Sequence, residues 1–459
     1  MSFLRPDKSG ESSKKMKTTK ETFLDDTERW SVDRLERFQW RKLHALVKYA
    51  YLKLPFYHRR YDKAGIKLQD IKRIQDFSKL PMLHKSDIML ARHDSNNFLT
   101  GMEVFNSGEP ATLGMTSGTT GTDFLYCSRR WRRYQGERLL RAYWWAGLRP
   151  GMSMMLTVPA WHCWAAEESY LVQRLGVVGV VPWGTFLPRF AGNILDTIVD
   201  LRPEFISMFL PMLYAILAEC KRRGVELRQA FTGVRCILVV GAPLTPASRQ
   251  KLQEEFGTDV YAGAGTTEGL IAMECSEHRG YHLFVDTCYL EVVNPSTGEP
   301  VPVGERGLLV LTAFNPYGTV YIRFDTGDLG RINTEPCPCG RSWPRIEIYD
   351  RLANTFSVQG KKLVPYDVRL CLDEIPELTG LPFSVIRQKT PTNFVWLALQ
   401  KPPTDMTSLE TKLKEMIKQK LQVSLRAEWV EALPSRWKGA PVIEEAEWRG
   451  EGGRERYGG

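Results

Sequence analysis

The sequence has no apolar run long enough to cross a bilayer, which takes about 18 residues or more. The longest candidate, LGVVGVVPW at Leu175–Trp183, is far shorter and is typical of a buried strand. The polar segment Lys8–Glu21 is followed by no apolar signal-peptide core. We therefore expect a cytoplasmic protein with no membrane partner.

A disulfide framework is also absent, because nine cysteines in 459 residues is an ordinary cytosolic content. Three of them have neighbours that can bind metal: CPCG contains Cys337 and Cys339, and ECSEHRGYH contains Cys275, His278 and His282. Two thiols in a tight turn and a distant Cys/His pair suit tetrahedral zinc. We predict a structural Zn²⁺ site completed by either His278 or His282, the alternative being free buried thiols.

The chain lacks a coherent basic face, although its net charge is +9. The most basic run, RRWRRYQGER at Arg129–Arg138, interleaves Trp131 and Tyr134 with arginines. Its helical spacing favours a solvated helix face beside an anionic small molecule. We therefore predict no nucleic-acid partner.

Strands and helices alternate between about residues 110 and 335. Strand-like runs such as EFISMF, VRCILVVG and TDVYAGAG are separated by helical runs such as PMLYAILAECKRRG and TPASRQKLQEEFG. This alternation indicates a largely parallel, helix-covered sheet with ligand sites at the strand ends. Upstream, Ser31 can cap a long amphipathic helix that ends near Pro55.

The pattern changes twice toward the C-terminus. After about residue 285, two strand runs around turn residues indicate an antiparallel β subdomain. Beyond Arg351, a compact α+β unit of about 100 residues follows. We therefore predict an α/β protein with a flexible arm (1–25), a large N-terminal domain of helix-covered sheets (26–350) and a small α+β C-terminal domain (351–459).

The stretch GMTSGTTGTDF, at Gly114–Phe124, is rich in glycine and hydroxyl groups and lies between two strand-like segments. Such a loop can direct several backbone N–H groups and hydroxyls at one anion. It is not a Walker loop, because no Gly-Lys-Ser/Thr follows four variable residues. The loop favours phosphate binding over a surface linker.

TSGTTG resembles the phosphate loop of the adenylate-forming enzymes, which activate carboxylates with ATP. Three more motifs resemble that family in the expected order: AGTTEG at 264–269, IRFDTGDLGRI at 322–332 and DRLANTFSVQGKKLVP at 350–365. The opening helical region and CPCGR resemble the phenylacetate–coenzyme A ligase branch more narrowly. The resemblance spans about residues 25 to 445.

The resemblance implies the ligands of ATP. They are Thr116, Ser117, Gly118, Thr119, Thr120 and Gly121 for the β- and γ-phosphates, Gly241, Ala242, Pro243, Ala264, Gly265 and Thr266 around the base, and Asp328 with Arg351. Thr267 would contact the α-phosphate and Glu268 would bind Mg²⁺, a hard ion that prefers carboxylate oxygen. Asp328 has two acceptor oxygens, which suit the two ribose hydroxyls.

The family also implies a catalytic lysine from a mobile C-terminal domain. LPSRWKGAPVI resembles the segment that carries it, and Lys438 is its only lysine. Its ammonium group would counter the charge that develops between carboxylate and α-phosphate. The hinge departs from the family pattern, since Ala353 and Asn354 stand where two aspartates are usual.

A substrate pocket is expected after the strand run MSMMLTVPA. There Trp161, His162 and Trp164 are equally consistent with walls for an aryl or arylalkyl acid and with core aromatics. The resemblance implies an AMP-forming ligase with coenzyme A as acceptor, and a homodimer is compatible with this branch. The alternatives are transfer to an amine or a carrier-protein thiol, and a non-catalytic nucleotide-binding protein on the same fold.

Overall fold

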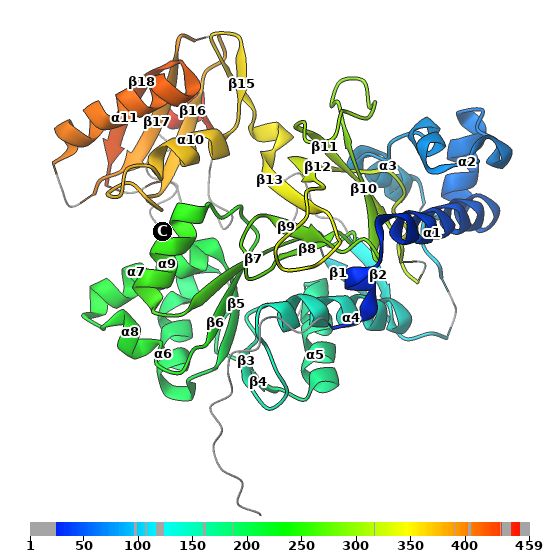
Figure 1. Ribbon diagram of the computed structural model, residues 1–459, viewed down its shortest axis with the longest axis horizontal. Helices are drawn as coiled ribbons and strands as arrows, with labels where there is room; N and C mark the ends of the chain where they lie inside the picture. The colour runs from blue at the N-terminus through cyan, green and yellow to red at the C-terminus, as the bar shows by residue number, and fades with distance from the viewer. Residues whose placement is uncertain are drawn as a thin grey trace, which may run out of the picture.

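The predicted parallel strands form one half of an eleven-stranded sheet in the computed structural model (Figure 1). The structure describes residues 24–449 apart from 96–98, 106–107, 116–123, 159–161, 186, 316, 391, 403–404, 432 and 434–441. In spatial order the strands are β10 (Cys288–Val293), β11 (Gly307–Ala313), β12 (Phe324–Asn333), β13 (Arg345–Arg351), β9 (Tyr281–Leu283), β8 (Ile271–Glu274), β7 (Asp259–Gly265), β6 (Cys236–Val240), β5 (Phe205–Phe209), β3 (Ser153–Met155) and β4 (Val178–Val180).

The sheet changes from parallel to antiparallel at β7. Strands β4, β3, β5, β6 and β7 are parallel neighbours, whereas every pairing from β7 through β8 to β10 is antiparallel. The β subdomain expected after residue 285 is therefore continuous with the parallel half. The hairpin of β7 and β8 makes this connection.

Helices cover the parallel half of the sheet, as the sequence predicts. Helix α9 packs on β7 and α7 packs on β5, while α4 packs on the neighbouring antiparallel strand β8. Helix α9 starts where Thr245 Oγ1 accepts a hydrogen bond from Ser248 N at 3.1 Å. The helices of this region are α4 (Arg129–Trp145), α5 (Cys163–Leu175), α6 (Ala191–Leu201), α7 (Leu210–Arg223), α8 (Leu227–Ala230) and α9 (Pro246–Phe256).

The N-terminal helices α1 (Val32–Lys53), α2 (Pro55–Lys63) and α3 (Lys85–Asp94) pack at the antiparallel end of the molecule (Figure 1). Ser31 occupies the N-cap position of α1, but its hydroxyl makes no capping hydrogen bond with the described residues. Pro55 ends this helix as predicted and begins α2, where a missing N–H costs nothing.

The segment before α1 is anchored in the core. Glu28 lies in a short 3-10 helix (Asp26–Arg29) and is completely buried. Its carboxylate accepts hydrogen bonds from Arg341 Nε at 3.0 Å and from Trp145 Nε1 at 3.3 Å. Asp25 forms an ion pair with Arg141. Asp25, the last residue of the predicted arm, therefore contacts the large domain.

One strand prediction was wrong in its burial. LGVVGVVPW contains β4, which is the edge strand of the large sheet rather than a buried one. The exposed fractions of Val178, Val181 and Trp183 are 61%, 74% and 77%. A short apolar run indicates a strand but not its place in the sheet. None of the described helices combines the length and apolarity that a bilayer crossing requires.

The C-terminal residues form an α+β unit beside α9 (Figure 1). Its elements are the hairpin β14 (Phe356–Val358) and β15 (Lys361–Leu363), α10 (Pro365–Leu372), β16 (Phe383–Arg387), β17 (Phe394–Gln400), α11 (Met406–Leu421), β18 (Ser424–Val430), β19 (Val442–Glu444) and α12 (Glu445–Arg449). The carboxylate of Asp373 accepts hydrogen bonds from Ser248 Oγ at 2.7 Å and from Thr245 Oγ1. Asp373 therefore ties this unit to the start of α9.

Candidate functional site

Two of the expected nucleotide motifs lie at the carboxyl ends of adjacent parallel strands. The register of β6 and β7 pairs Val240 with Gly263, so the turn Gly241–Pro243 lies beside the start of AGTTEG. Gly241 has φ 83°, and a Cβ there would lie 2.3 Å from the ring of Phe209. Only glycine allows this close approach, which leaves backbone exposed at the strand end.

The second motif is the tight turn between β7 and β8. Thr266 N donates to Leu270 O at 3.0 Å, and Gly269 N donates to Thr266 O at 3.1 Å. Thr267 and Glu268 therefore lie at the tip of the turn, and both are partly exposed. A carboxylate in this position can coordinate a hard cation.

The stem of the Gly/Thr-rich loop lies against α5. Strands β1 (Ala111–Met115) and β2 (Phe124–Ser128) pair with each other on either side of the loop. A Cβ at Gly114 would lie 2.7 Å from Cβ of Cys163, the first residue of α5. The charge of Glu268 raises the pKa of Cys163, after the larger effects of burial and of Glu167 and Cys127. The loop stem and the Glu268 turn thus approach the same helix end.

The third nucleotide motif is a polar pair on the antiparallel half of the sheet. Asp328 and Arg351 are direct Cα partners on β12 and β13. Arg351 Nη1 and Asp328 Oδ1 lie 3.2 Å apart. The strand pairing therefore unites two residues that are 23 positions apart in the sequence.

Several expected site residues lie outside the described part of the chain. They are Thr116, Ser117, Gly118, Thr119, Thr120 and Gly121 of the phosphate loop, Trp161 of the substrate pocket, and Lys438. Their roles stay predictions.

A cavity that is partly open to solvent adjoins the Thr266–Gly269 turn. Its wall is mostly apolar and combines side chains of α4 and α5 with strands β6, β7 and β8. The lining residues are Gln135, Leu139, Ala142, Tyr143, Trp164, Glu167, Leu238, Val240, Gly263, Ala264, Gly265, Thr266, Thr267, Ile271, Ala272 and Met273. Small residues on β7 leave room beside the turn, which suits a flat apolar ligand.

Two of the three predicted pocket aromatics are described. Trp164 lines the cavity, and its ring lies 3.4 Å from the Cβ position of Gly265. His162 is buried and accepts a hydrogen bond from Trp164 N at 3.2 Å, so it caps α5 rather than lining the cavity. Sequence reasoning missed Gln135 and Glu167, because polar side chains on helices usually indicate a solvated face.

Adjacent carboxyl groups of α5 have different surroundings. Glu168 Oε1 accepts a hydrogen bond from Tyr143 OH at 2.8 Å, and that hydroxyl lies 3.0 Å from Ser207 Oγ. Burial raises the pKa of Glu168 to about 7, although the Tyr143 hydrogen bond opposes the shift. Burial, and then the charge of Glu168, raises the pKa of Glu167 well above its usual range. Glu167 therefore favours the neutral acid, whereas Glu168 loses its proton as the pH rises through about 7.

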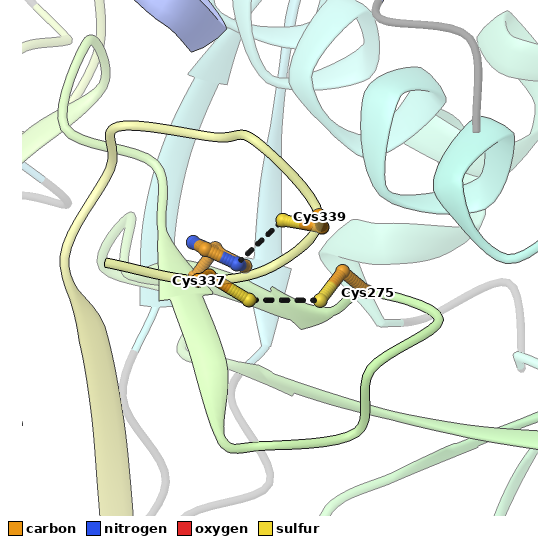
Figure 2. Close-up of side chains that lie close together, drawn as sticks. Cys275, Cys337 and Cys339 are labelled. Carbon is orange, nitrogen blue, oxygen red and sulfur yellow. Dashed lines mark hydrogen bonds between the residues drawn. The ribbon is translucent and has the colours of Figure 1, made fainter. Parts of the chain in front are cut away.

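The predicted metal ligands include four that converge (Figure 2). One ligand atom from each of Cys275, His282, Cys337 and Cys339 lies within 4.8 Å of the others. Cys275 Sγ and Cys337 Sγ are 3.7 Å apart, and Cys339 Sγ and His282 Nε2 are 3.4 Å apart. Three thiols and one imidazole match a closed tetrahedral zinc site.

The surroundings of the Cys/His cluster fit a metal site. His282 Nδ1 lies 2.8 Å from Trp343 O, which orients Nε2 toward the thiols as the ligating atom. His278 is placed elsewhere: its Nδ1 lies 3.2 Å from Glu274 Oε2, and its ring packs on Tyr261. Of the two histidines left open by the sequence, the structure brings His282 to the cluster.

The chain is similar to known coenzyme A ligases. Phenylacetate–coenzyme A ligase of Thermus thermophilus is 28% identical over 368 residues, covering 78% of this chain and 79% of the relative. The enzyme of the same name from Escherichia coli strain K12 is 26% identical over 335 residues, covering 68% and 70%.

Among solved structures, 2-hydroxyisobutyryl-CoA ligase with its acyl-adenylate in the postadenylation state has the same fold. The TM-score is 0.81 at 20% identity, with 92% of each chain covered. For the same ligase in the thioesterification state the TM-score is 0.65 at 20% identity, with 91% of each chain covered. Residues 60–314 match the AMP-binding enzyme family. This chain belongs to the AMP-binding enzyme family.

Proposed function

We propose that this protein is an AMP-forming acid–coenzyme A ligase. A carboxylate oxygen attacks the α-phosphorus of ATP, pyrophosphate leaves, and an acyl-adenylate forms. The sulfur of coenzyme A then attacks the acyl carbonyl carbon, AMP leaves with the carboxylate oxygen, and the thiol proton is lost to solvent. The convergence of the Gly241–Pro243 turn, the Thr266–Gly269 turn and the β1–β2 loop stem carries this proposal.

The proposed residue roles combine this placement with the family resemblance. Thr267 would donate to the α-phosphate, and Glu268 offers the carboxylate oxygens that a Mg²⁺ ion prefers. Asp328 would accept hydrogen bonds from the ribose hydroxyls while Arg351 holds its orientation. The loop Thr116–Gly121 would bind the β- and γ-phosphates, and Lys438 would neutralise charge in the first half-reaction. A cytoplasmic location is also proposed, where ATP and coenzyme A are supplied.

The acid is proposed to be an aryl or arylalkyl carboxylic acid. The cavity beside the Thr266–Gly269 turn is largely apolar, and Trp164 offers a flat wall. Phenylacetate–coenzyme A ligases are among the relatives. An aromatic ring fits such a wall better than a polar chain does.

We also propose that Cys275, His282, Cys337 and Cys339 hold a structural zinc ion. The four side chains come from two segments, the chain after β8 and the loop before β13. Four protein ligands leave no open position for a substrate, so the ion would stabilise the fold. It would tie the β8–β9 segment to the loop before β13.

Pyrophosphate exchange with a panel of carboxylic acids tests the proposed function. We expect acid-dependent exchange, and AMP release that requires coenzyme A. Glu268→Gln should lower exchange by at least about 100-fold, since it removes charge that acts on the transferring group. Glu254→Gln, an exposed change on α9, is the matched control and should leave exchange unchanged.

Two outcomes would redirect the proposal. Exchange with no tested acid would favour a non-catalytic nucleotide-binding protein. Exchange without coenzyme A-dependent AMP release would favour an amine or a carrier-protein thiol as acceptor. Lys438→Ala should impair adenylation but spare thioester formation from a preformed acyl-adenylate. Normal adenylation by this variant would remove Lys438 from the mechanism.

A further inference from the structure

The cavity beside the Thr266–Gly269 turn contains two buried polar side chains. Gln135 on α4 and Glu167 on α5 line it, with exposed fractions of 4% and 3%. Gln135 Oε1 and Glu167 Oε1 have no hydrogen-bond partner among the described residues. Buried polar atoms of this kind are uncommon unless a ligand or water satisfies them.

Glu167 lies away from the Glu268 turn, where the carboxylate of the substrate would react. Cys163, at the start of α5, lies next to the phosphate-loop stem, and Thr267 of the Glu268 turn lines the same cavity as Glu167. Glu167 lies four residues later on α5, hence on the same helix face and about 6 Å further along the axis. Trp164 lies between Cys163 and Glu167 along α5 and also lines the cavity. A substrate with its carboxylate at the Glu268 turn would therefore reach Glu167 with its far end.

The unpaired atoms are hydrogen-bond acceptors. The Oε1 atom of an amide accepts, and a neutral carboxylic acid keeps a carbonyl oxygen that accepts. Burial raises the pKa of Glu167, so the neutral form is favoured and no cation is required opposite it. The wall contains other donors, namely the hydroxyls of Tyr143, Thr266 and Thr267 and the indole N–H of Trp164. None of them bonds to either unpaired oxygen, and the Tyr143 hydroxyl is committed to Glu168 and Ser207.

We infer that the substrate acid carries a hydrogen-bond-donating substituent at the end remote from its carboxylate, and that Glu167 and Gln135 accept from it. This inference rests on the proposed acid-activating function. The substituent is an uncharged hydroxyl or aromatic amino group. Glu167 and Gln135 are thereby the specificity-determining residues, because an acid without the donor would leave both acceptors buried and unpaired.

A panel of matched acids tests the inference. Benzoates and phenylacetates with hydroxyl, amino, methyl or no substituent at the meta or para position are compared by kcat/KM for pyrophosphate exchange. We expect the best hydroxyl- or amino-bearing acid to exceed its methyl counterpart by at least about 100-fold. The hydroxyl and amino series then show which donor the site prefers.

Three variants separate the role of Glu167 from general packing. Glu167→Leu should reverse the preference in favour of the methyl-bearing acid, and Gln135→Met should reduce it. Glu168→Gln is the matched control, because the neighbouring side chain is equally buried but bonds to Tyr143. It should keep the preference of the wild-type protein.

The outcomes distinguish this inference from the proposed function. Wild-type exchange rates within about threefold for methyl- and donor-bearing acids would overturn the inference and leave the ligase assignment intact. An unchanged preference in a folded Glu167→Leu protein would also overturn it. Absence of exchange with every acid would instead reject the ligase assignment. The wild-type panel gives a decision even if Glu167→Leu does not fold.

Discussion

The Cys/His cluster and the cavity beside the Thr266–Gly269 turn differ in how their buried polar atoms are paired. Each brings together side chains from distant segments in a buried place. In the cluster, every ligand atom faces another, and His282 Nδ1 is also bonded to the backbone. In the cavity, Glu167 and Gln135 each keep an acceptor without a described partner. Buried polar atoms that all face one another indicate a structural role, and buried acceptors without a partner indicate a ligand.

The largest expected effect is at the Cys/His cluster. Cys337→Ser should abolish zinc binding and lower the thermal midpoint by roughly 10 °C, because metal-binding free energy contributes to folding. Elemental analysis and thermal unfolding measure both effects. Cys220→Ser, at a buried thiol outside the cluster, should keep the zinc. A wild-type protein without zinc and an equally stable Cys337→Ser variant would mean that the cluster is only packed thiols.

The Asp328–Arg351 pair tests whether a carboxylate that already has an arginine partner can also accept hydrogen bonds from a ligand. Asp328→Ala should raise KM for ATP by roughly 100-fold, because two hydrogen bonds to a charged acceptor are lost. KM for the acid should change little, since the cavity is on the other half of the sheet. Exchange kinetics with each substrate varied in turn measure this. A lower thermal midpoint with unchanged KM for ATP would assign the pair to structure alone.

Glu168 provides a pH-dependent test. Its pKa in the folded protein is about 7, above the ordinary 4.5, so the folded state holds the proton more tightly than the unfolded state. The free energy of unfolding should therefore fall by up to about 3 kcal/mol as pH rises through this interval. Glu168→Gln should flatten that decline. Urea unfolding of both proteins at several pH values measures the free energy of unfolding. The same dependence on pH in both proteins would show that Glu168 does not cause the decline.

The smallest effect is expected at the contact between α9 and the C-terminal unit. Asp373→Asn weakens the acceptor for Ser248 and Thr245 without changing its size. If this unit rotates between the half-reactions, as the family resemblance implies, the weaker contact should speed thioester formation by about threefold. Stopped-flow measurements from preformed acyl-adenylate test this. Slower thioester formation would show that the contact belongs to the second step instead.

Much of the architecture could be predicted because local chemistry and tertiary structure agree. The runs that form β5, β6 and β7 are apolar, and they alternate with helices whose ends are marked by capping residues. This alternation predicts that the strands are parallel. The nucleotide motifs lie at strand ends, where parallel sheets place ligands. The four motifs, in their order along the chain, also predict the family.

The remaining features depend on long-range placement. Strand β4 has the composition of an interior strand, and only the finished sheet shows that it is the edge. His278 and His282 are four residues apart. The path of the backbone after Cys275 determines which of the two lies beside the thiols. Glu167 and Glu168 are adjacent in sequence, yet the helix rotation between them turns one to the cavity and the other to Tyr143. No local pattern distinguishes such neighbours.

The buried contact between Glu28 and Arg341 has a consequence for synthesis of the chain. These residues are 313 positions apart, and both side chains are fully buried. Glu28 leaves the ribosome long before its partner exists, so it stays hydrated while the large sheet is translated. The N-terminal segment can dock only after the Cys337–Cys339 loop and Arg341 have emerged. Docking of the segment before α1 is therefore a late event in the synthesis of the large domain, because most strands of the large sheet are made before Arg341.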